Sequence, residues 1–162
     1  MRFKGLALVV SAFAFAACGG GENNSDTAVV PDADAAPATT TPAGPAAQPG
    51  QITGTTHEVK MLGDDKGYRF EPADLKVKAG DGVKFVMVSG GPHNVDFSQG
   101  AGAAASQLTA NMPNQMAPLS GPYLSNPNEA YTVSFANVPA GSYEYICTPH
   151  VAMNMKAKIT VE

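Results

Sequence analysis

From about residue 57 onward, apolar and polar residues alternate along short segments, and glycine, proline, asparagine and aspartate separate these segments. The alternation is clearest in residues 155–162, where Ala157, Ile159 and Val161 are interleaved with lysines and a threonine. A period of two residues is typical of a strand that buries one face. This part of the chain is therefore predicted to consist of strands.

The same pattern recurs in six other segments. They are residues 57–62, 68–81, 82–88, 92–97, 130–135 and 141–147. Seven or eight short strands with turn residues between them predict an all-β sandwich. The segment between residues 100 and 128 lacks the alternation, so we expect a long loop there, with one helical turn near residues 103–108.

Residues 19–56 have a different composition. They contain several prolines, many alanines and threonines, acidic residues without a lysine or arginine, and no aromatic residue. Such a segment cannot bury enough apolar surface to fold by itself. Residues 18–56 are therefore predicted to be a disordered linker in front of a domain at residues 57–162.

The first residues have the pattern of a targeting signal. Arg2 and Lys4 precede an apolar run from Leu6 to Ala17, which is shorter than the roughly 20 residues that a membrane-spanning helix needs. Small residues directly before Cys18 resemble a bacterial lipoprotein signal, in which cleavage leaves the cysteine at the new N-terminus and lipid is attached to it. We interpret residues 1–17 as a signal peptide and Cys18 as the lipid attachment site; an ordinary signal peptide cut nearby is the alternative. Both interpretations predict export, and the first predicts a lipid-anchored protein in the periplasm or on the outer face of the cell membrane.

The net charge and the number of cysteines reduce the range of possible functions further. The net charge of −4 disfavours nucleic acid as a partner, because nucleic acid binding requires a basic surface. If Cys18 carries lipid, Cys147 has no intramolecular disulfide partner. A single thiol in an oxidising compartment needs burial or a bound metal ion.

The C-terminal part of the chain holds a set of metal-binding residue types. Cys147, His150 and Met155 lie close together in the sequence, and His93 lies far upstream. One thiolate, two imidazoles and one thioether are the ligands of a blue-copper site. A zinc site would favour further cysteines or carboxylates at close spacing, and a dinuclear copper centre would need a second bridging cysteine. The residue types therefore favour mononuclear copper.

Three motifs resemble the plastocyanin and pseudoazurin family of blue copper proteins. "CTPH" with Met155 resembles the family's C-[ST]-P-H-x₄-M loop, "GGPHNVDF" resembles the stretch that carries its first histidine, and "MKAKITV" is similar to its last strand. The resemblance covers about residues 57–162. It implies a cupredoxin Greek-key β-sandwich of about eight strands with one type 1 copper ion, which cycles between Cu(I) and Cu(II). The copper ligands that it implies are His93, Cys147, His150 and Met155.

Two methionines lie in residues 147–155, which we call the ligand loop. Met155 has the plastocyanin spacing, whereas the spacing of Met153 resembles that of amicyanin. The residues that follow Met155 match the start of the family's last strand, and Met155 shares the face of Ile159, so Met155 is the predicted ligand. Met153 is then expected in the loop, on the surface near the copper.

The resemblance also implies a residue that supports the ligand loop. Asn94 is similar to the family residue that bonds to the serine or threonine after the cysteine, here Thr148. Plastocyanins of the oxygenic chain have a tyrosine directly before the cysteine as a second electron route. This chain has Ile146 there and Tyr145 one residue earlier, on the opposite strand face. That route, and a photosystem partner, are therefore not expected.

The predicted function is transfer of single electrons between membrane-associated or periplasmic redox proteins, through transient encounters of a monomer. We identify no catalytic residue and no cofactor other than copper, so an enzyme is not expected. The main alternative is a copper-binding protein for delivery or storage. An electron-transfer domain that serves one dedicated oxidase or reductase is a third possibility.

Overall fold

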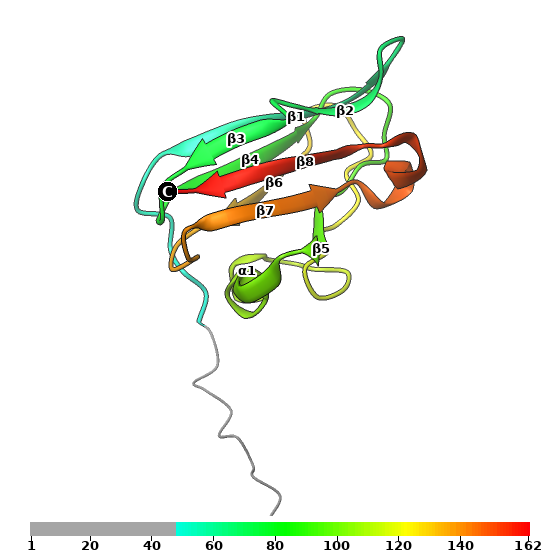
Figure 1. Cartoon of the computed structure of the whole chain (residues 1–162). Helices are drawn as coiled ribbons and strands as arrows, with labels where there is room; N and C mark the ends of the chain where they lie inside the picture. Colours follow the sequence, from blue (N-terminus) through cyan, green and yellow to red (C-terminus); the bar gives the residue numbers. More distant parts are fainter. Residues whose placement is uncertain (1–47) are drawn as a thin grey trace, which may run out of the picture. The chain divides into compact units, whose positions relative to one another are not determined.

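The computed structural model describes residues 48–162. The predicted signal peptide (residues 1–17), Cys18 and most of the predicted linker lie outside the described residues. The described part of the chain forms two four-stranded sheets, one short α-helix and two 3₁₀ helices (Figure 1). No helix of this part is long and apolar enough to cross a membrane.

The two sheets have the strand orders β2-β1-β4-β6 and β3-β8-β7-β5. The strands of the first sheet are β1 (Thr56–Asp64), β2 (Gly67–Glu71), β4 (Gly82–Met87) and β6 (Ala130–Ser134). Those of the second are β3 (Asp74–Val77), β5 (Asp96–Gly100), β7 (Gly141–Ile146) and β8 (Lys156–Val161). The pairs β1–β4 and β3–β8 are parallel, and the other pairs are antiparallel. The predicted all-β sandwich of about eight strands is confirmed.

The core lies between the sheets, where the apolar side of each strand is buried. In β8, Ala157, Ile159 and Val161 are buried, and the intervening residues are at least partly exposed, as the alternation predicts. Tyr145 on β7 is also buried, and its ring packs edge-on against Phe70 at a centroid distance of 4.7 Å. Tyr145 thus belongs to the core and does not reach the surface.

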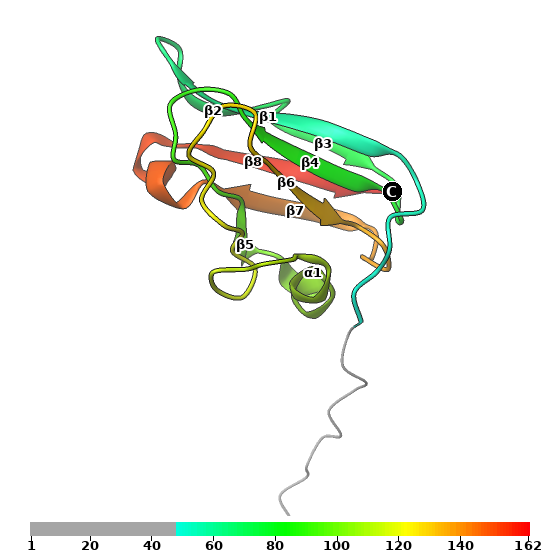
Figure 2. The same ribbon diagram turned by 180° about the vertical axis from the view of Figure 1, so that it is seen from behind.

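The segment between β5 and β6 contains more helix than predicted. A 3₁₀ turn, η1 (Gly102–Ala104), leads into α1 (Ala105–Asn111), and Figure 2 shows this segment along one edge of the sandwich. The predicted single turn is too short because tertiary contacts extend the helix. Leu108 and Asn111 are both buried against the rest of the domain.

Residues 48–55, which we call the N-terminal arm, differ from the prediction. The sequence places them in a disordered linker, but they are hydrogen-bonded to the domain. The N–H group of Gly50 donates to the side-chain oxygen of Asn111 at 2.7 Å. Two further N–H groups of the arm donate to the carbonyl of Gly80, each at 3.0 Å. The arm is therefore part of the folded unit.

A buried carboxylate joins the arm to the start of β4. Asp81 accepts hydrogen bonds from the N–H groups of Lys78 and Thr55 and from the ring of His57, at 2.8 to 2.9 Å. A Cβ atom on Gly54 would lie 2.1 Å from this carboxylate, so only glycine allows this close approach. The ring of His57, near the start of β1, is only partly exposed because it bonds to Asp81.

The pKa of Asp81 predicts loss of stability in acid. The N–H group of Lys78, and then the ring of His57, lower this pKa from 3.8 to about 2. A lowered carboxylate pKa stabilises the fold above the unfolded-state pKa, and this contribution disappears as the pH falls from about 4 through about 2. The expected loss is about 2 kcal/mol of unfolding free energy. Denaturant titrations of the metal-free protein between pH 6 and pH 2 measure it.

Asp81→Asn provides the comparison for this acid effect. The variant should already be less stable at pH 6, and its unfolding free energy should fall less steeply than that of the wild type between pH 4 and pH 2. Equal slopes for the two proteins would show that Asp81 does not cause the acid sensitivity.

The arm lies at one end of the sandwich, and the loop with the predicted copper ligands lies at the other. The arm bonds to Gly80, just before β4, whereas the segment with His93 begins after the far end of the same strand. In Figure 1 the described N-terminal residues (cyan) and the C-terminus lie at one end, and the loop between β7 and β8 lies at the opposite end. The chain thus enters the domain far from the predicted site.

Candidate metal centre

Two loops at one end of the sandwich carry the predicted ligands. His93 lies in the connection between β4 and β5, and Cys147 directly follows β7. His150 lies in η2 (Thr148–Met153), and Met155 directly precedes β8. All four side chains are buried. The structure therefore places all four predicted ligands in the interior, within or beside these two loops.

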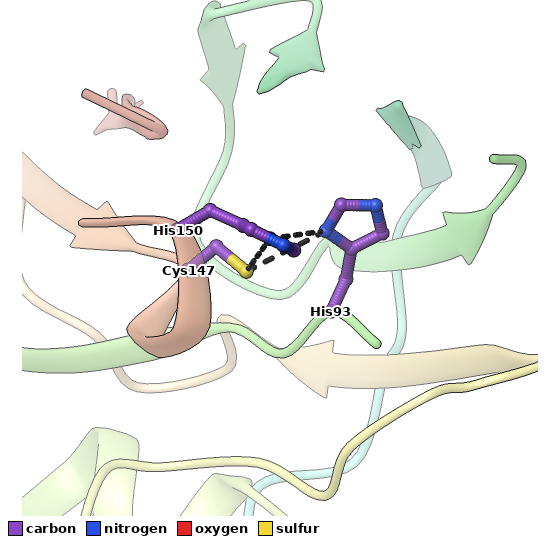
Figure 3. Close-up of side chains that lie close together, drawn as sticks. All are labelled: His93, Cys147 and His150. Carbon is purple, nitrogen blue, oxygen red and sulfur yellow. Dashed lines mark hydrogen bonds between the residues drawn. The ribbon is translucent and has the colours of Figure 1, made fainter. Parts of the chain in front are cut away.

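Three of these side chains converge on one point. Figure 3 shows Cys147 and His150 on the ligand loop facing His93 on the other loop. The Nδ1 atoms of the two histidines are 3.1 Å apart, and Cys147 Sγ lies 3.5 Å from His93 Nδ1 and 3.3 Å from His150 Nδ1. The three atoms form a compact cluster that could hold one metal ion.

The protonation of His93 follows from its second ring nitrogen. His93 Nε2 lies 2.8 Å from the carbonyl oxygen of Ser89. A carbonyl can only accept, so Nε2 must carry the proton and Nδ1 must present its lone pair. A fixed tautomer of this kind is typical of metal-binding histidines. The bond also identifies the acceptor of the His93 ring N–H group, which the sequence does not reveal.

The ligand loop is closed by its own backbone. Cys147 N–H donates to the carbonyl of Met155 at 3.0 Å, and the N–H groups of His150 and Met155 donate to the carbonyls of Cys147 and His150, respectively. Asn154 adopts the left-handed conformation (φ 62°), which asparagine tolerates better than most residues. These bonds bring the first and last residues of the loop together.

Met153 and Met155 have opposite environments. Met155 is fully buried and lies directly before the strand that continues its face, as predicted. Met153 is 48% exposed. A metal ligand in the interior needs a buried donor atom, so the burial favours Met155 over the half-exposed Met153.

Asn94 and Thr148 contact each other as expected. The N–H group of Thr148 donates to Asn94 Oδ1 at 2.8 Å, and Asn94 Nδ2 lies 3.2 Å from the hydroxyl of Thr148. Asn94 Nδ2 also donates to the hydroxyl of Ser120 at 3.2 Å. Asn94 thereby ties the ligand loop to both its own loop and the segment before β6.

Burial keeps the donor atoms neutral. Desolvation lowers the pKa of His93 and of His150, and for His150 the neighbouring His93 lowers it further. Desolvation also raises the pKa of the Cys147 thiol. Both imidazoles are therefore ready to bind a metal ion at neutral pH, whereas the thiol must lose a proton when a metal ion binds.

Tyr68 on β2 covers one face of His150. The two rings are stacked with centroids 3.9 Å apart and planes 18° from parallel. Tyr68 also meets the ring of His93 edge-on at 6.1 Å. The stacking restricts the orientation of the His150 ring. Sequence patterns did not indicate this contact, because β2 is far from both histidines in the chain.

The donor set fits a copper ion. Two ring nitrogens that bind one transition metal at about 2 Å each lie about 3 to 3.6 Å apart, and the Nδ1–Nδ1 distance is 3.1 Å. One thiolate with two imidazoles and a thioether suits copper in both oxidation states. A hard cation would prefer carboxylate ligands. Among the described residues, no carboxylate belongs to the cluster. Geometry and chemistry thus agree on copper.

Comparison with known proteins gives the family. The model of the copper binding proteins of the plastocyanin/azurin family matches residues 57–162. The chloroplast plastocyanin of Physcomitrium patens is 39% identical over 103 residues, 64% of this chain and 56% of that protein. The plastocyanin of Scenedesmus fuscus is 36% identical over 107 residues, 64% of this chain and 97% of that protein. A solved mutant fern plastocyanin is 30% identical, with a TM-score of 0.49, and the match covers 65% of this chain and 99% of that one.

The family model spans more than half of the chain and includes both loops that carry the predicted ligands. This chain therefore belongs to the plastocyanin/azurin family of copper-binding proteins and is a type 1 cupredoxin.

Proposed function

We propose that this protein is an exported electron carrier that passes single electrons between membrane-associated or periplasmic redox proteins. His93, Cys147, His150 and Met155 would hold one copper ion. The observation that carries the proposal is the convergence of two imidazole nitrogens and one thiol sulfur within hydrogen-bond distance of one another, in a chain of a copper-binding family.

The protein would hold its copper ligands in nearly the same arrangement in both oxidation states of the metal. Bound copper would supply the redox chemistry, by alternating between Cu(I) and Cu(II). The Ser89 carbonyl fixes the tautomer of His93, Tyr68 stacks on His150, and Asn94 ties Thr148 to the neighbouring loop. Supports of this kind reduce ligand movement when the charge of a site changes, which makes electron transfer faster.

An apolar surface beside His150 would be the docking site for redox partners. Val151 and Met153 are 47% and 48% exposed, and Pro149 is exposed as well. His150 itself is 6% exposed, so it lies just beneath this surface. An apolar surface with few charges suits weak and brief encounters. A partner bound there would be separated from the site by little more than the His150 ring.

The location of the protein is inferred from its N-terminal sequence. The short apolar run before Cys18 supports export and attachment of lipid to this cysteine. Because the chain enters the domain at the end opposite the ligand loop, an anchored domain could present the docking surface away from its attachment point. Fractionation of cells that express the wild type and Cys18→Ser tests this location, and equal membrane association of both proteins would argue against lipid on Cys18.

The experiment that tests the function is addition of Cu(II) to the purified metal-free protein. Intense visible absorption and the EPR signal of type 1 copper are expected, because a copper–thiolate bond gives a strong charge-transfer band. Reversible one-electron reduction should follow in a redox titration. A colourless product with an ordinary tetragonal copper signal would rule out the type 1 site and leave copper delivery or storage as the better interpretation.

The two methionines of the ligand loop give a matched pair of variants. Met155→Leu should raise the reduction potential, because the oxidised form loses a weak sulfur donor. We expect roughly a tenfold change in the relative affinity for the two oxidation states, about 59 mV for one electron. Met153→Leu should leave the potential and the visible spectrum unchanged, because Met153 is largely exposed. The reverse result, with the larger shift in Met153→Leu, would exclude Met155 as the ligand.

A further inference from the structure

Two carboxylates are buried in the described part of the chain, one at each end of the sandwich. Asp81, beside the arm, is paired with His57. Asp96, the first residue of β5, is 9% exposed and lies beside the predicted copper site. Within residues 48–162, no lysine, arginine or histidine forms an ion pair with Asp96. A buried charge without a cationic partner is costly and requires an explanation.

Asp96 contacts both chain neighbours of Cys147. Its backbone is the β-sheet partner of Ile146, the residue before the cysteine. Its Oδ2 atom lies 3.2 Å from the hydroxyl of Thr148, the residue after it. Because consecutive Cα atoms are about 3.8 Å apart, the Asp96 carboxylate lies roughly 10 Å from the Cys147 sulfur.

The hydrogen bonds give the contact between Asp96 and Thr148 a direction. A carboxylate only accepts, so the Thr148 hydroxyl donates to Asp96 and accepts from Asn94 Nδ2. The other carboxylate oxygen of Asp96 accepts the N–H group of Ser98 at 2.8 Å. The Asp96 charge is thus the end point of a hydrogen-bonded chain that begins at the residue next to His93.

We propose that Asp96 controls the copper site electrostatically. Its carboxylate stabilises the oxidised form of the site and thereby lowers the reduction potential. The inference rests on the proposed copper site. The oxidised site carries one more positive charge than the reduced site, so a nearby negative charge favours the oxidised site. The positive charge that compensates Asp96 is then that of the occupied metal site.

The expected size of the effect follows from Coulomb's law. A unit charge about 10 Å away, in a medium with an effective dielectric constant of about 20, changes an affinity roughly tenfold. Asp96→Asn should therefore lower the affinity for Cu(II) relative to that for Cu(I) about tenfold, which raises the potential by about 59 mV. Asp96→Glu, which keeps the charge, should remain close to the wild type.

Redox titration of the copper-loaded full-length protein tests the proposal, and the visible and EPR spectra report whether the ligands are unchanged. Glu144→Gln is the matched control, because it removes the same charge from an exposed position on β7, next to the strand of Asp96. Its smaller shift should vanish in high salt, whereas the Asp96→Asn shift should persist because the carboxylate is buried. If Asp96→Asn does not fold, Asp96→Ser is the second neutral variant and should give the same shift.

Thr148→Val separates the charge from the hydrogen-bonded chain. This variant loses the hydroxyl but keeps the Asp96 charge, so its potential should shift by less than half as much as that of Asp96→Asn. Equal shifts in the two variants, or neutral variants with an unchanged or lower potential, would overturn the role of the charge. A wild-type protein without a type 1 spectrum would instead overturn the proposed function, so the two failures are distinguishable.

Discussion

Cys147→Ser should abolish the intense visible absorption of the copper-loaded protein. Cys147 is the only described donor that can supply a thiolate, and the absorption comes from charge transfer between that thiolate and copper. Serine is nearly the same size, so the metal-free domain should still fold. Copper addition followed by visible and EPR spectroscopy measures the loss, and circular dichroism of the metal-free protein reports the fold.

Cys18→Ser is the matched control, because it changes the other cysteine of the chain in the same way. Its copper-loaded protein should retain the full absorption. A copper-loaded Cys147→Ser protein that keeps the intense band and the type 1 EPR signal would show that the cysteine is not a ligand.

Asn111→Ala should lower the unfolding free energy of the metal-free protein by about 3 kcal/mol. Asn111 is buried, and its Nδ2 atom donates to the carbonyls of Ser134 and Ala136 at 2.9 and 2.8 Å. Its Oδ1 atom accepts the N–H group of Gly50 in the arm. Alanine would leave all three backbone groups without their partner. Denaturant unfolding measures the loss, and faster amide hydrogen exchange at Gly50 should accompany it.

Gln107→Ala provides the control for this prediction. Gln107 lies on the same helix and donates to Asn111 Oδ1 at 2.9 Å, but its side chain is only partly buried. We expect a loss below about 1 kcal/mol. Equal stabilities of Asn111→Ala and the wild type would show that the arm and α1 do not depend on this side chain.

The ligand loop could be predicted because its information is local. Cys147, His150 and Met155 lie within nine residues, and their spacing and the strand pattern that follows identify them. His93 could be paired with them only through residue chemistry and family resemblance, because no sequence rule places residues 54 positions apart in contact. The fold class was equally accessible, since two-residue alternation and turn residues are also local signals.

The contacts that support the site could not be predicted in the same way. The acceptor for His93 is a backbone carbonyl, which every residue has, so Ser89 carries no signal in its side chain. Tyr68 reaches His150 from a strand about 80 residues earlier, and Asp96 reads as one more polar residue in an extended segment. The only signal in the sequence was that Asp96 is a charged residue between two apolar residues.

The N-terminal arm is a segment whose ordered structure could not be predicted from its composition. Its composition indicates a disordered linker, because it has too few apolar residues to fold by itself. The domain supplies the missing partners through Gly80, Asp81 and Asn111. Composition describes what a segment can do alone, whereas these hydrogen bonds exist only after the domain has folded.

The sequence by itself determined the fold class, most of the strands, the family resemblance and the chemical identity of the predicted metal-binding residues; it did not place β5 (Asp96–Gly100), which overlaps the predicted segment 92–97 in only two residues. These follow from the local alternation of side chains and from the donor atoms that a metal ion needs. Only the tertiary structure decided which imidazole nitrogen of His93 faces the site, which ring covers His150 and which charge lies beside Cys147. These features depend on distances between segments that are far apart in the chain, and packing of the two sheets sets those distances.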